Sequence, residues 1–198
     1  MSDTPAVVED LALGAFRLVK EKLGFDLDFT AETLPILDHY LISLREEDGG
    51  VPDEKVVALV APCAGAYFGE VLRRTLPGFR WHTPKEDYQG WRLEGERVFL
   101  SLNPIGVVLE ALHGQALADW AAHLALMPED REAVTRSLEA TGPVREEDYH
   151  RLAVRHEVVE QTLSVLGALA ASKGEGPVEL SHEVYASVLD GKSPAVDA

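Results

Sequence analysis

Cysteine is almost absent from this chain, because Cys63 is the only one in 198 residues. A lone cysteine cannot close an internal disulfide, and its neighbours at 61–66 are apolar, so we expect a small buried side chain without redox chemistry. The N-terminus lacks the basic start and apolar block of a signal peptide. No apolar run approaches the roughly 18 residues of a membrane span. These absences predict a cytoplasmic protein.

Basic residues are also scarce. Lysine and arginine number 18 against 34 aspartates and glutamates, which gives a formal charge of −16. Repulsion from phosphate then opposes binding to nucleic acid or to an anionic membrane, so we expect neither partner. The acidic residues are dispersed along the chain, which favours a solvated surface. The alternative is a DNA mimic, and interleaved arginines argue against it by breaking up a continuous negative face: Arg73, Arg74, Arg97 and Arg151.

The common catalytic and cofactor motifs are missing. There is no phosphate-binding GxxxxGK[ST], no GxGxxG after a strand, no GxSxG, no HExxH and no CxxC. Phosphate cradles, nucleophile elbows and the usual zinc sites therefore lack support. We expect no cofactor, although the absence of these motifs does not exclude an enzyme.

Hydrophobic periodicity predicts a helix-dominated α+β fold. Two strands around a glycine turn at 94–96 and a third at 79–83 favour a small antiparallel sheet of about three strands in the middle of the chain. We expect one domain over 1–191 and a mobile tail over 192–198. The expected helices lie at 7–23, 30–44, 53–76, 105–112, 129–140, 146–171 and, after a cap at Ser181, up to 189.

The helix at 53–76 carries the most specific pattern. Pro62 removes an amide from its interior, which predicts either a kink or two consecutive helices. Ala61, Gly65 and Gly69 recur every four residues and form a ridge without bulk, against which another backbone can pack closely. Glu70 is spaced for an ion pair with Arg73 or Arg74, typical of a solvated surface contact.

A binding surface is predicted beside this helix and the tryptophan-bearing strands. Its candidate residues are Tyr67, Glu70, Arg74, Trp81 and Trp91, because aromatic side chains with a few polar groups are typical of recognition sites. The alternative for each tryptophan is a place in the core.

The segment Gly65-Ala-Tyr-Phe-Gly-Glu-Val-Leu-Arg-Arg74, followed by Trp81 and a strand-rich stretch ending in Asn103-Pro104, resembles small uncharacterised bacterial proteins classed as domains of unknown function. The resemblance covers about residues 30 to 112. It implies a fold and no activity.

Two Glu-x-x-His pairs, Glu110 with His113 and Glu147 with His150, match the spacing of di-iron carboxylate ligands. The first lies at the end of a short helix beside a sheet, so we expect no metal site and favour surface ion pairs. Glu147, His150 and His156 would share one face of the helix at 146–171, and are the candidates for acid–base catalysis.

We therefore expect a non-enzymatic cytoplasmic module that binds a protein partner or a small ligand. The alternative is a metal-dependent or acid–base hydrolase that uses the Glu/His face around 146–160. The sequence leaves the oligomeric state open.

Overall fold

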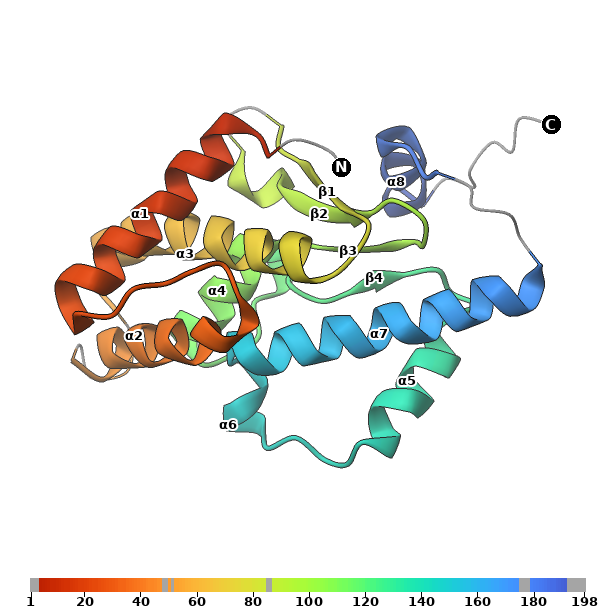
Figure 1. The fold of residues 1–198 in the computed structure, drawn as a ribbon. Helices are drawn as coiled ribbons and strands as arrows, with labels where there is room; N and C mark the ends of the chain where they lie inside the picture. The colour runs from red at the N-terminus through yellow and green to blue at the C-terminus, as the bar shows by residue number, and fades with distance from the viewer. Residues whose placement is uncertain (1–3, 48–49, 51, 85–86, 175–178, 192–198) are drawn as a thin grey trace.

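The computed structural model describes residues 4–47, 50, 52–84, 87–174 and 179–191. The fold is α+β and dominated by helices, as predicted, with a small antiparallel sheet in the middle of the chain (Figure 1). The longer helices are α1 (Ala6–Leu23), α2 (Leu34–Glu47), α3 (Glu54–Thr75), α4 (Pro104–His113), α5 (Arg131–Ala140), α7 (Leu152–Lys173) and α8 (His182–Leu189), and α6 (Glu146–Tyr149) is a single turn. The predicted tail at 192–198 lies outside the described residues.

The sheet has four strands rather than about three. Its order is β1 (Phe79–His82), β2 (Arg92–Gly95), β3 (Leu100–Leu102) and β4 (Ala125–Leu126), all antiparallel. The additional strand β4 is only two residues long and pairs with β3 from a segment more than twenty residues later. A two-residue strand has no readable alternation, so local sequence could not reveal it.

Helix α3 is the centre of the core. It runs unbroken through Pro62, so the alternative of two consecutive helices was wrong. Its start was also predicted correctly, because the Asp53 side chain accepts a hydrogen bond from the backbone amide of Lys55 at 2.8 Å and caps the helix. The helix is buried on all sides from Val60 to Leu72.

The small-residue ridge lies where it was expected. A methyl group added at Gly65 would approach Cα of Ile105 at 2.6 Å, and one added at Gly69 would meet the Trp81 ring at 2.3 Å. Helix α4 and strand β1 therefore pack directly on the α3 backbone. This contact confirms the close packing and places the tryptophan-bearing strands in the interior.

By length and composition α3 could also cross a membrane, and 67% of its most apolar window is buried inside the protein. This corrects the expectation that no segment approaches a membrane span. Alanines, valines and leucines raise the mean hydropathy of α3, while alanines and glycines keep it from forming a continuous run of large apolar side chains.

Helices cover both faces of the sheet. Phe79 and Trp81 of β1 point into the core toward α3, while Arg80 and His82 point to the opposite face. Helix α8 lies on that second face, where its buried Tyr185 donates a hydrogen bond to the carbonyl of Gly95 at 2.8 Å. In Figure 1 α7 runs across the molecule, with α5 and α6 on its outer side.

Candidate functional site

The predicted binding residues are used mainly for internal packing. Tyr67, Glu70, Trp81 and Trp91 are buried, with exposures of 0 to 6%. They do not form an open surface, because Tyr67 packs against the Phe29 ring while the Trp81 indole turns inward to the Glu70 carboxylate. Of the five, Arg74 is the partly exposed one, and its guanidinium lies 3.7 Å from the centre of the Phe29 ring.

Tyr67 anchors the segment between α1 and α2. Its hydroxyl accepts a hydrogen bond from the Phe29 amide at 3.0 Å, and its ring stacks on Phe29 at 5.0 Å. Phe29 has a φ of 62°, a left-handed conformation that is rare for a bulky residue. Tyr67 therefore has a structural role in holding a strained turn.

Glu70 forms a buried network rather than a solvated ion pair. Its carboxylate accepts from the Trp81 indole at 2.8 Å, from Arg73 at 2.8 Å and from Arg74 at 3.0 Å. Burial alone would raise the pKa of this carboxyl, but hydrogen bonds from Arg73 and Trp81 and the positive charge of Arg73 lower the pKa below its ordinary value. The expectation of a surface contact was wrong.

The three candidate catalytic residues do not share one helix face. The predicted helix at 146–171 is divided at His150 and Arg151 into α6 and α7. His156 is only 6% exposed, and its Nε2 lies 2.8 Å from the Thr75 hydroxyl. Burial lowers the pKa of His156. The Glu147 side chain lies outside the described part of the structure.

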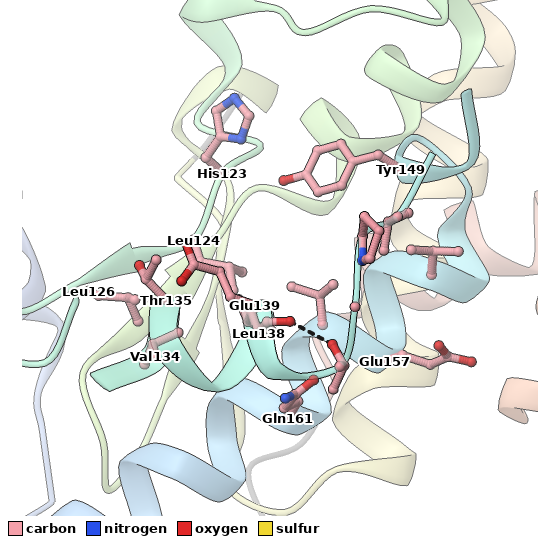
Figure 2. A pocket seen from close by; sticks show the side chains of 16 residues that line it. His123, Leu124, Leu126, Val134, Thr135, Leu138, Glu139, Tyr149, Glu157 and Gln161 are labelled. Carbon is pink, nitrogen blue, oxygen red and sulfur yellow. Dashed lines mark hydrogen bonds between the residues drawn. The ribbon is translucent and has the colours of Figure 1, made fainter. Parts of the chain in front are cut away.

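A cavity of about 690 Å³ lies between α5, α7 and the segment that leads to β4 (Figure 2). Its walls are largely aliphatic, formed by Leu124, Leu126, Val134, Leu138, Pro143, Val144, Val154 and Val158. The volume falls within the range of about 300 to 1,000 Å³ that is typical of small-molecule sites.

A hydrogen bond beside the cavity joins the two helices that form it. The side-chain amide of Gln161 on α7 donates to the Ser137 carbonyl at the end of α5 at 2.7 Å. Thr141 then donates to the Leu138 carbonyl at 2.6 Å, and Gly142 turns the chain with a φ of 98°. The loop that follows this turn, through Pro143 and Val144, forms part of the cavity lining.

His123 and Tyr149 lie together at one end of the cavity. Figure 2 shows the His123 ring and the Tyr149 hydroxyl at the same end, while Val134 and Leu138 lie deeper along α5. Tyr149 is held by Arg155, whose guanidinium lies 4.7 Å from the ring centre. Arg155 also donates to the Ala122 carbonyl, next to His123.

Behind His123 and Tyr149, the positive charge of Arg155 faces the negative charge of Glu110. Arg155 and Glu110 are both nearly fully buried, and Nη1 of Arg155 lies 3.7 Å from Oε2 of Glu110. Nε2 of His123 lies 3.7 Å from the other oxygen of Glu110. The described residues that line the cavity include Glu139 and Glu157 but no lysine or arginine. The cavity therefore favours a neutral or cationic ligand over an anionic one.

Sequence reasoning missed this cavity, because its walls come from three separate segments that carry no motif. The one available signal was the apolar stripe Val134 and Leu138 on α5, which would have indicated packing only. Compared with models of protein families, with curated proteins and with solved structures, the chain matches none of them.

Proposed function

We propose that this chain is a non-enzymatic module that binds a small, largely apolar ligand in the α5–α7 cavity. The observation that carries the proposal is the cavity itself, with aliphatic walls and with His123 and Tyr149 at one end. An apolar body would gain from leaving water, at about 25 cal/mol per Å² of buried apolar surface. A hydroxyl or amine on the ligand could bond the tyrosine or the imidazole.

The charge of the residues that line the cavity restricts the charge of the ligand. Glu139 and Glu157 lie at the cavity and the whole chain carries a charge of −16. A carboxylate or phosphate would approach against this field, whereas an amine would approach with it. The proposed ligand is therefore neutral or positively charged. The cytoplasmic location and the exclusion of nucleic acid and membranes stay predictions from composition.

Binding of the neutral dye Nile red tests the proposal. Leu138→Trp fills the cavity from the α5 side, so we expect the dye to bind at least about tenfold more weakly. The matched control is Leu59→Trp, because Leu59 is 58% exposed on α3 and does not line the cavity. Decylamine should displace the dye more effectively than decanoate. Equal dye binding by both tryptophan variants would overturn the proposal.

A second variant distinguishes loss of the binding site from loss of folding. Val144 lines the cavity and is 49% exposed, so Val144→Glu adds a charge at the rim without opening the core. This variant should unfold at the same denaturant concentration as the unmodified chain and still bind Nile red more weakly. If Val144→Glu binds the dye as well as the unmodified chain does, the cavity is not the binding site.

A further inference from the structure

The outer face of the sheet carries a second group of polar side chains, far from the cavity. Strands β1 and β2 pair so that Arg80 lies opposite Glu94 and His82 opposite Arg92. All four side chains emerge on the face that α8 covers. His182, the first residue of α8, completes the group.

Three of these residues bring metal-binding atoms together. One ligand atom each from His82, Glu94 and His182 lie within 4.8 Å of one another. Nδ1 of His182 is 2.6 Å from Oε2 of Glu94, and the ring centres of His82 and His182 are 4.9 Å apart. From these contacts we propose that His82, Glu94 and His182 bind one divalent transition-metal ion of the zinc class, independently of the proposed ligand cavity.

The donor set fits such an ion. Two imidazole nitrogens and one carboxylate oxygen are ligands that zinc accepts at about 2.0 to 2.2 Å, with water in a fourth position. Tetrahedral coordination at these lengths requires donors about 3.4 Å apart, so His82 and His182 must each shift slightly. His182 can do so readily because its side chain is 43% exposed at the start of a helix.

Each ligand can present a lone pair. Burial lowers the pKa of His82, and the positive charge of Arg92 lowers it further, which favours the neutral ring that carries a lone pair. The carboxylate of Glu94 only accepts hydrogen bonds, so the short contact from His182 requires a hydrogen on Nδ1. A metal takes the place of that hydrogen, and the proton of the neutral ring then resides on Nε2.

Arg80 and Arg92 hold the Glu94 carboxylate in place, but they also weaken the binding of a cation. Arg92 donates to Oε1 of Glu94 at 2.6 Å, which orients the carboxylate and leaves Oε2 for the metal. Arg80 lies 3.3 Å from Oε2 and also donates to the Leu180 carbonyl. Their positive charges oppose a cation, so we expect the site to bind zinc more weakly than one without them. The site joins the sheet to α8, so metal binding should fix α8 in place.

Calorimetric titration of the metal-free chain with zinc alone tests the inference. We expect one zinc per chain, and at least about tenfold weaker binding in His182→Ala. His39→Ala is the matched control, because His39 is an exposed histidine on α2 outside the cluster. Cobalt should give the intense visible bands of four-coordinate geometry in the unmodified chain and lose them in His182→Ala.

Amide hydrogen exchange distinguishes the proposed site from nonspecific zinc binding at the surface, which would not change exchange in α8. Zinc should slow amide exchange in α8 of the unmodified chain and leave exchange in His182→Ala unchanged. Equal zinc affinity in the unmodified chain and His182→Ala, or α8 exchange that zinc does not alter, would overturn the inference. Leu138→Trp should bind zinc normally, so failure of the cavity proposal and failure of the metal proposal can be told apart.

Discussion

Glu70 joins α3 to β1 through the hydrogen bond that it accepts from the Trp81 indole. All of its arginine and tryptophan partners are donors, so Glu70→Gln would point an amide hydrogen at groups that need an acceptor. Leaving buried partners unpaired costs about 2 to 4 kcal/mol. We expect that loss in the free energy of unfolding at pH 7, measured in urea.

The control for this variant is Glu132→Gln, because Glu132 is an exposed residue whose ion pair with Arg136 lies on the surface of α5. It should change the free energy of unfolding by less than about 0.5 kcal/mol. Equal stability of Glu70→Gln and Glu132→Gln would show that the buried network does not stabilise the fold.

The Glu70 network also shows what single residues do not reveal in a sequence. The spacing of Glu70, Arg73 and Arg74 correctly predicted which residues pair. Whether the pair is solvated depends on Trp81 and on Thr4, which donates to the same carboxylate at 3.1 Å. Neither partner lies on α3, so local spacing could not distinguish a buried network from a surface pair.

At the scale of helices and strands, Gly65→Ala tests the close contact between α3 and α4. The added methyl group would meet backbone atoms of Ile105, which cannot move like a flexible side chain. Overpacking of this kind costs about 1 to 3 kcal/mol. Gly167→Ala on α7 makes the same substitution at an exposed position with open space and should stabilise the protein by about 0.5 to 1 kcal/mol. Thermal unfolding should give opposite signs for the two variants; the same sign would contradict the packing account.

This ridge was predictable because a repeat of small residues every four positions is a local signal. The limits of α3 and α5 and the pairing of β2 with β3 were predictable for the same reason. The position of the turn was predicted wrongly, because Glu94 and Gly95, expected in the turn, lie in strand β2. The break between α6 and α7 could not be predicted from the local sequence. Asp38 of α2 accepts hydrogen bonds from the amides of Leu152 at 2.6 Å and Ala153 at 3.1 Å. A capping residue 114 positions away leaves no trace in the local sequence.

The candidate sites depended on the whole fold still more strongly. The cavity draws its lining from the segment around His123, from α5 and from α7, and the proposed metal ligands come from β1, β2 and α8. In each case residues distant in sequence become neighbours only through tertiary packing. Sequence patterns identified residue types suited to chemistry, but they grouped them by spacing along one helix, and the fold groups them across elements.

Asp38 couples the stability of the whole molecule to pH. Burial raises the pKa of its carboxyl to about 6, although the two α7 amides lower it. Because the ordinary value is 3.8, the folded protein binds a proton here more tightly than the unfolded chain does. The stability from this proton is fully present below about pH 4 and is lost as pH rises through about 6. The difference between the folded and the ordinary pKa corresponds to about 3 kcal/mol in the free energy of unfolding.

Asp38→Asn removes this titration and keeps one acceptor for the α7 amides. We measure the free energy of unfolding in urea from pH 4 to pH 7 for both proteins and subtract the variant's value, so that titrations elsewhere cancel. The difference should fall as pH rises between about 4 and 6 and then level off. A difference that does not change with pH would mean that the Asp38 carboxyl titrates alike in the folded and unfolded chains, and that its hydrogen bonds to α7 fully offset its burial.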